Sequence, residues 1–240
     1  MTLLNGAMGI KDNFNRIRSE ADGICRAYGR DPESLRIIAV SKTHPAETVQ
    51  EAIESGILLF GENKVQEAQK KIPLLTGSPV FHLVGHLQSN KTRQAVALFD
   101  LIHSIDRLTT AAAVNDEAAR IGKVQKVLVQ VNTSYESSKN GVSPDEAATL
   151  VHQMSDLKNI DVRGLMTIGP FTDNIDTIRK SFRLLKNLLD DINSSYGMTI
   201  NELSMGMTSD YHVAIEEGAT MIRIGTAIFG QRDYDATNRQ

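Results

Sequence analysis

The sequence predicts an α/β fold, a single (β/α)8 TIM barrel preceded by one helix. Short apolar runs of strand length alternate eight times with longer stretches of helical periodicity. The apolar runs lack a polar face, which is typical of parallel strands covered by helices. The length of 240 residues is also close to the size of one such barrel. A doubly wound open sheet is the alternative that the same alternation allows.

The elements follow one another in a regular order. The leading helix is expected at residues 10–28, where apolar residues recur at helical spacing from Phe14 to Ile24 and Gly29 offers an end. Eight strands are expected after it, at residues 35–40, 57–60, 80–84, 101–105, 127–131, 162–168, 203–205 and 221–224. Helices are expected between them, at residues 45–55, 64–71, 90–98, 108–121, 144–154, 175–192 and 211–217. Pro45 suits a first helical position, and glycines suited to a left-handed cap follow three helices, at positions 56, 122 and 218.

The composition is that of an ordinary globular chain, with 41% hydrophobic and 23% charged residues. A net charge of −3 gives no reason to expect nucleic acid or a membrane surface as a partner. No apolar run approaches the roughly 20 residues of a bilayer span, and the first residues lack a signal-peptide pattern. Cys25 is the single cysteine, which argues against a disulfide framework and fits a reducing cytoplasm. One domain over 1–240 is expected, with a core from about 10 to 230 and a loose polar tail after Gly230.

Lys42 stands where the first strand ends. In a barrel of this kind the functional site lies at the C-terminal ends of the strands. Strand alternation places Ile38, Val40 and Lys42 on one face, which would be the barrel lumen. Desolvation there would lower the pKa of the amine from about 10.4, and a neutral amine forms an imine with a carbonyl compound. The alternative is a lysine whose charged head reaches out to water.

Two turns near the C-terminus suit a phosphate group. Ser204 and Gly206 lie in a turn before a helix, and Gly225 and Thr226 follow the last strand, where residues 227–229 could form a short extra helix. Barrels of this class often hold a phosphate at these two loops, through free N–H groups at helix N-termini. Simple capping of the helix by Thr208 or Ser209 is the alternative for the first turn.

Polar residues elsewhere at the strand ends leave choices open. Arg223 would share a strand face with Gly225, and a buried guanidinium needs an acceptor, such as a ring nitrogen or a carboxylate of a ligand. An ion pair with Glu202 or Glu62 is the alternative. Asn63 lies between an expected strand and the helix that follows it, and is either an N-cap or a ligand contact.

The histidines give no metal signature. His82 and His86 near the third strand have no partners at metal-ligand spacing, so no metal site is expected. His86 is a candidate for proton transfer, although the sequence favours a structural histidine with satisfied hydrogen bonds.

Six segments together resemble one protein family. The segments AVSKTHP, FGENKVQE, FHLVGHLQSNK, GLMTIGPF, LSMGM and RIGTAIFG occur in the order found in the pyridoxal phosphate homeostasis proteins, also called the YggS or PROSC family. Those proteins resemble the N-terminal barrel domain of alanine racemase, the fold-type III kind of pyridoxal phosphate (PLP) protein. The resemblance extends over residues 10–230 and implies that the cofactor is pyridoxal 5'-phosphate.

The resemblance also implies roles for individual residues. Lys42 would hold the cofactor as an internal aldimine, and Arg223 would face its pyridine nitrogen. Asn63 would lie on the wall of the site. The phosphate would be surrounded by Ser204, Gly206, Gly225 and Thr226. The residues that follow, Thr208 to Asp210, depart from the pattern common in the family, which leaves a third phosphate contact open.

The family's role implies a carrier or buffer that binds PLP and supplies it within the cell, with apo PLP-dependent enzymes as possible partners. No catalytic residue is assigned, and a monomer is expected. A fold-type III enzyme such as an amino-acid racemase is the alternative, and it would need His86 or Tyr135 as an acid or base opposite Lys42. A Schiff-base aldolase without a cofactor would explain Lys42 and the phosphate turns but not Arg223.

Overall fold

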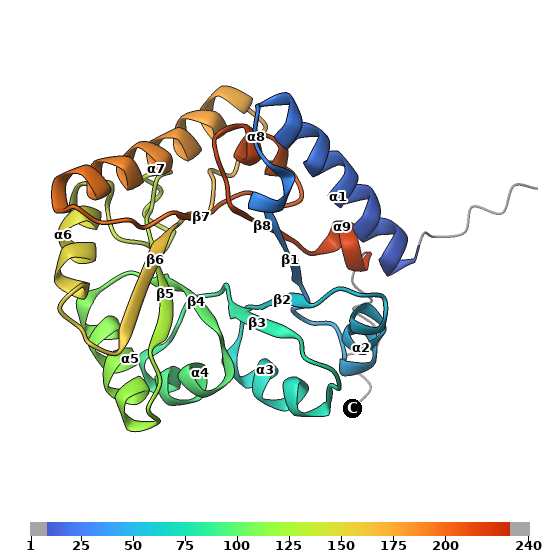
Figure 1. The fold of residues 1–240 in the computed structure, drawn as a ribbon, viewed down its shortest axis with the longest axis horizontal. Coiled ribbons are helices and arrows are strands. Elements are labelled where there is room, and N and C mark those ends of the chain that lie inside the picture. Colours follow the sequence, from blue (N-terminus) through green and yellow to red (C-terminus); the bar gives the residue numbers. More distant parts are fainter. Residues whose placement is uncertain (1–8, 231–240) are drawn as a thin grey trace, which may run out of the picture.

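The computed structural model describes residues 9–230, so the tail expected after Gly230 lies outside the described residues. Its strands form a closed parallel barrel in sequence order, and the last strand pairs with the first (Figure 1). The strands are β1 (Arg36–Val40), β2 (Leu59–Glu62), β3 (Val80–Leu83), β4 (Leu101–Ile105), β5 (Gln125–Gln130), β6 (Ile160–Met166), β7 (Glu202–Ser204) and β8 (Met221–Ile224). The predicted barrel is confirmed, and the open sheet is excluded by the β8–β1 pairing.

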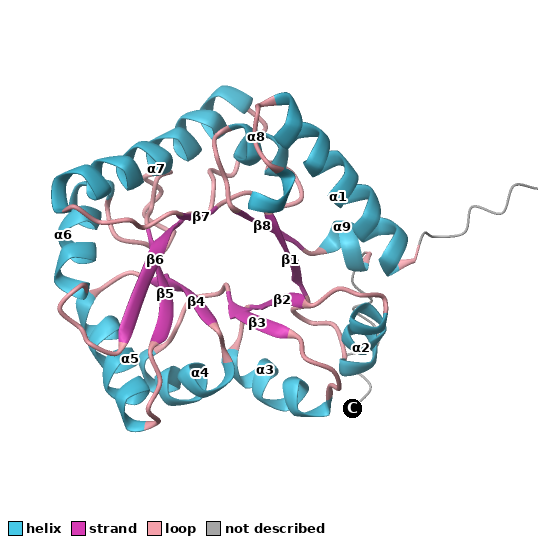
Figure 2. Cartoon of the chain, viewed as in Figure 1, coloured by secondary structure: helices cyan, strands magenta, loops and turns pink. Residues whose placement is uncertain are grey.

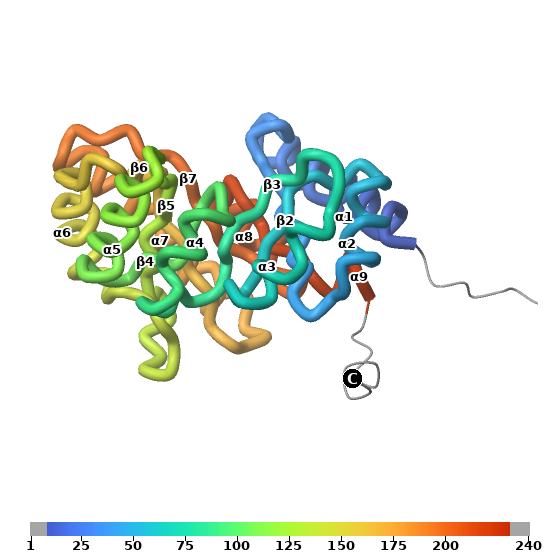
Figure 3. Tube along the Cα trace, turned by 90° about the horizontal axis from the view of Figure 1, so that it is seen from below, coloured from blue at the N-terminus to red at the C-terminus, as the bar shows by residue number. Residues whose placement is uncertain are grey.

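Helices surround the barrel on the outside (Figure 2). They are α1 (Ile10–Ala27), α2 (Ala46–Glu54), α3 (Val65–Lys71), α4 (Thr92–Leu98), α5 (Leu108–Arg120), α6 (Pro144–Met154), α7 (Ile175–Tyr196), α8 (Tyr211–Glu216) and α9 (Thr226–Phe229). The leading helix α1 packs against α8 and α9, and Figures 1 and 3 both show it beside α9. The helices within residues 9–230 include none with the length and apolar character needed to cross a membrane.

Some element boundaries differ from the predicted ones, for local reasons. The second strand begins two residues later than expected, because Gly56 turns left-handed at φ 94° and the Ile57 N–H caps helix α2 by donating to Ala52 O at 3.0 Å. Helix α7 continues past the last apolar residue of its pattern and stops at Gly197, which has a φ of 62°. Hydrogen bonding at the helix ends, rather than apolar periodicity, decides these boundaries.

Apolar side chains fill two separate regions. The larger one lies between the strands and the helices and includes Phe60, Phe81 and Phe182. The smaller one fills the barrel lumen with Ile38, Val40, Val84, Leu101, Leu128, Met166 and Met221. Ile38 and Val40 therefore share the lumen face, as strand alternation predicts. The packed lumen leaves the C-terminal mouth of the barrel as the place for a ligand.

Candidate cofactor site

The ends of β1, β2 and β8 meet around Lys42. Val40 pairs with Gly61 in β2, and on the other side Gly225 follows β8 directly against Val40. A Cβ added to Gly225 would lie 3.4 Å from Val40 O. Lys42 itself is half-buried. The structure thus brings Lys42 to the same end of the barrel as Asn63 and Gly225.

The Asn63 backbone is fixed by contact with its neighbour in the barrel. A Cβ on Gly85 would lie 2.2 Å from Asn63 O and 2.7 Å from Asn63 Cα, so the close approach requires glycine at position 85. Lys64, not Asn63, is the N-cap residue of α3. The capping alternative for Asn63 is therefore wrong, and a ligand contact stays a prediction.

Arg223 lies inside the lumen with an exposed fraction of 5%. Its Nη1 donates to Ser204 Oγ at 2.6 Å and its Nη2 to the carbonyl of Thr167 at 2.7 Å. The ion-pair alternative is wrong, because Glu202 pairs with Arg36 and Glu62 pairs with Lys71.

Burial sets the charge state of this arginine. Desolvation lowers the pKa of Arg223 to about 10, an effect that the Asp210 carboxylate opposes, so the guanidinium stays charged at neutral pH. A guanidinium has more N–H donors than these two acceptors use. A buried cation with unused donors favours a ligand that brings an acceptor.

A chain of hydrogen bonds continues from Arg223 across the lumen. Ser204 Oγ lies 2.9 Å from His103 Nδ1, and His103 Nε2 lies 3.1 Å from His82 Nδ1. Because arginine only donates, the Ser204 hydroxyl accepts from Arg223. The tautomers of the two rings decide which atoms donate between Ser204, His103 and His82. Burial is the main cause that lowers the pKa of His82 to about 3 and the pKa of His103 well below its ordinary value, so both rings are neutral.

This series of hydrogen bonds was not predicted from the sequence. The only available signal was a histidine, His103, inside a mostly apolar strand, two residues after the lumen residue Leu101. In the structure the hydroxyl of Ser204 is fully buried and bonded to Arg223 and His103. A contact between Ser204 and a phosphate stays a prediction.

The turn after β7 is pressed against α8. Gly206 has a φ of 90°, and a Cβ there would lie 2.5 Å from the Cβ of Ala214. Asp210, which sequence analysis left without a role, closes the turn by accepting the Met207 N–H at 2.6 Å. Burial raises the pKa of this carboxyl group. Because Asp210 is the N-cap residue of α8, capping by Thr208 or Ser209 is wrong.

The turn after β8 contains the predicted short extra helix. Gly225 is the N-cap residue of α9, and its carbonyl accepts from Ile228 and Phe229. Thr226 is exposed at the first position of this helix. Gly206, Gly225 and Thr226 all follow strands at the C-terminal mouth, where a phosphate could reach them.

The residues considered for acid–base chemistry lie in other loops. His86 has Nδ1 3.8 Å from Asp106 Oδ2. Tyr135 is exposed, with a left-handed φ of 58°, in a loop whose base is closed by Val142 N donating to Gln130 O. Within the described part of the chain, no three His, Cys, Asp or Glu side chains form a group that could hold a metal ion.

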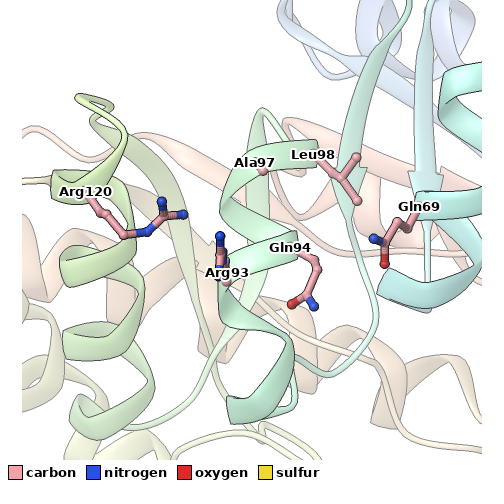
Figure 4. Close-up of a pocket in the computed structure, with 6 residues that line it drawn as sticks. All are labelled: Gln69, Arg93, Gln94, Ala97, Leu98 and Arg120. Carbon is pink, nitrogen blue, oxygen red and sulfur yellow. The ribbon is translucent and has the colours of Figure 1, made fainter.

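One cavity lies away from the barrel mouth. It has a volume of about 450 Å³ and lies on the outer ring of helices, over α3, α4 and α5 (Figure 4). Its lining is Gln69, Arg93, Gln94, Ala97, Leu98 and Arg120. None of the predicted site residues contributes to it.

The chain is similar to proteins of known family. The family model described as alanine racemase, N-terminal domain, matches residues 10–233. A pyridoxal phosphate homeostasis protein of Aquifex aeolicus is 38% identical over 228 residues, which cover 95% of this chain and 100% of the relative. A protein of the same name from Pseudomonas aeruginosa is 40% identical over 228 residues, covering 95% and 97%.

Solved structures agree with the barrel. PipY of Synechococcus elongatus, solved with PLP bound, is 35% identical and superposes with a TM-score of 0.82 over 92% of this chain and 100% of its own. An alanine racemase of Clostridium difficile is 16% identical, with a TM-score of 0.75 over 95% of this chain and 58% of its own. The second likeness shows the shared fold alone.

Proposed function

Because this chain belongs to the family of pyridoxal phosphate homeostasis proteins, built on the alanine racemase N-terminal barrel, we propose that it binds pyridoxal 5'-phosphate and maintains its supply in the cell. In this role the protein is a carrier that takes up the cofactor reversibly and releases it to apo-enzymes. The relatives' names and the PLP-bound neighbour support the cofactor.

Each predicted site residue has a task in this proposal. The Lys42 amine would form a covalent C=N bond with the cofactor's aldehyde carbon, with release of water. Gly206, Gly225 and Thr226, with Ser204, would surround the phosphate. Asn63, whose backbone is fixed against Gly85, would form the wall of the site.

The observation that carries the proposal is the buried guanidinium of Arg223, which has donors left over for an acceptor on a ligand. A pyridine nitrogen is such an acceptor. The PLP ring serves as an electron sink, but a guanidinium that keeps its proton leaves the ring nitrogen unprotonated, so that the sink is weak. This arrangement favours holding the cofactor over using it for catalysis.

An amino-acid racemase is the second candidate. It requires a proton donor and acceptor opposite Lys42, yet Tyr135 is exposed in its loop and His86 faces Asp106. We therefore propose that the protein has no robust catalytic activity. We further propose that it is monomeric and cytoplasmic, the compartment being supported by the absence of a second cysteine from the sequence.

Two measurements separate the carrier from the racemase. The PLP-loaded protein is mixed with an apo PLP-dependent enzyme, and recovery of that enzyme's activity is followed; a carrier restores it, and the Lys42→Ala variant does not. In parallel, exchange of the α-proton of added alanine is followed in D2O. Sustained exchange that is lost in Lys42→Ala would favour the racemase.

A further inference from the structure

The backbone beside Lys42 is strained. Thr43 has a φ of 67°, in the left-handed region that β-branched residues rarely adopt. Only one other non-glycine residue between 9 and 230, Tyr135, has a positive φ. Such a conformation persists only where surrounding contacts hold it, and it is frequent at functional sites.

Helix α3 holds the residue that follows Lys42. The Thr43 N–H donates to Glu67 Oε1 at 2.5 Å. The same oxygen accepts from Lys71 Nζ at 2.9 Å, one helical turn further along α3. The left-handed residue is therefore anchored to a helix through a carboxylate that is itself fixed by an ammonium group.

The same ammonium group holds the residue that precedes Lys42. Lys71 Nζ donates to the carbonyl of Ser41 at 2.9 Å and to Glu62 Oε1 at 2.8 Å. The Ser41 hydroxyl donates to Glu62 Oε1 at 2.6 Å. With its bond to Glu67, Lys71 thus uses three donors, as many as an ammonium group has.

The ion pair between Lys71 and Glu62 is buried, with exposed side-chain fractions of 5% and 0%. Glu62 Oε2 has no hydrogen-bond partner among the described residues, and burial raises the pKa of this carboxyl group. A buried ion pair is often no more stable than a well-packed apolar pair. Stability alone is therefore a weak reason for this pair.

We propose that Lys71, together with Glu62 and Glu67, is a positioning group that clamps both neighbours of Lys42 and thereby directs the Lys42 amine to the mouth of the barrel. The inference rests on the proposed function, because it takes Lys42 as the residue that binds PLP. None of the three clamp residues touches the cofactor in this account.

The test compares variants of α3 in the full chain. Lys71→Met removes the ammonium group that donates to Ser41, Glu62 and Glu67. Glu67→Ala removes the acceptor of the Thr43 N–H, and the Glu67 side chain is partly exposed. Glu67→Gln keeps an acceptor at that place. Lys70→Met, at an exposed lysine in the same helical turn, is the matched control. PLP affinity is measured by absorbance titration, the rate of borohydride-trapped labelling at Lys42 by peptide mapping, and folding by thermal unfolding.

We expect Lys71→Met and Glu67→Ala to bind PLP about tenfold more weakly or worse, and to label more slowly at Lys42, as a displaced reacting group would. The PLP affinity and labelling rate of Glu67→Gln should lie closer to those of the wild type than the values of Glu67→Ala do. Lys70→Met should have the affinity and labelling rate of the wild type. A stabilising role without positioning would change the unfolding temperature and leave affinity and labelling rate unchanged in the folded protein.

The outcomes separate the two proposals. If the wild-type protein labels at Lys42 and the folded Glu67→Ala variant keeps wild-type affinity and rate, the clamp is overturned and the carrier stands. If Lys71→Met does not fold, Glu67→Ala and Glu67→Gln decide the matter. If the wild type itself gives no label at Lys42, the proposed function fails and the clamp falls with it.

Discussion

At the scale of single residues, a series of hydrogen bonds across the barrel lumen connects the charged Arg223 side chain to three neutral side chains, those of Ser204, His103 and His82. Arg223 donates to Ser204, which contacts His103, which in turn contacts His82. Strand alternation alone predicts Arg223 on the face of Gly225, but not its partners. These partners come from β3, β4 and β7, and closure of the barrel brings them to Arg223 in β8.

The Ser204 hydroxyl should be needed for stability as well as for the site. Ser204→Ala leaves a buried charged donor of Arg223 without its acceptor, which costs about 1–3 kcal/mol. The free energy of unfolding is measured in urea at neutral pH. Ser209→Ala, at an exposed position in the same turn, is the control and should change little. Equal unfolding free energies for the two variants would contradict a stabilising role of the hydrogen bond between Arg223 and Ser204.

The buried histidines make the fold sensitive to acid. The pKa of His82 is about 3 when folded, below its ordinary value of 6.5, so the unfolded state binds more protons between these two values. Stability from the neutral ring is therefore fully present above about pH 6.5 and is lost progressively as the pH falls toward about 3. We expect His82→Gln, which does not titrate, to lose less unfolding free energy than the wild type between pH 7 and about pH 4. Parallel pH profiles of the two proteins would contradict this.

At the scale of elements, the turn between β7 and α8 requires glycine at position 206, where no other residue fits without strain. Gly206→Ala would place a methyl group 2.5 Å from the Cβ of Ala214 at a φ of 90°. We expect a loss of about 2 kcal/mol or more, because strain and overlap act together. Gly218→Ala is the matched control, with a φ of 96° and no neighbour closer than 3.7 Å to the added Cβ. Thermal unfolding that is alike for the two variants would show that only the dihedral angle matters.

Most elements follow from apolar patterns, but the links between them do not. The strand run from Ile37 to Val40 was predictable because apolar residues fill it on both faces, and the strand 221–224 because three of its four residues are apolar. The charged contacts of α3 were not, because a lysine is normally expected to reach solvent. Lys71 lies on the buried face of α3 with Val65 and Ala68, where it meets the ends of β1 and β2, whereas Lys70 lies on the exposed face.

At the scale of the whole molecule, eight alternating units in 240 residues were enough to predict a closed barrel, and barrel geometry was enough to locate the mouth. The strand ends at Lys42 and Gly225 lie side by side because β8 pairs with β1, although these residues are near opposite ends of the sequence. The identity of the ligand came from the family, since a lysine, an arginine and glycine turns suit several carbonyl phosphates. That the full chain, 1–240, acts as one domain stays a prediction.

The central claim is a covalent bond between Lys42 and PLP, and one measurement tests it most directly. The absorbance spectrum of the purified protein with added PLP is recorded before and after borohydride reduction, and the labelled peptide is mapped. We expect a yellow protein whose absorbance changes on reduction and whose label lies on Lys42 alone. A protein that stays colourless and unlabelled, or a label on another lysine, would contradict the account.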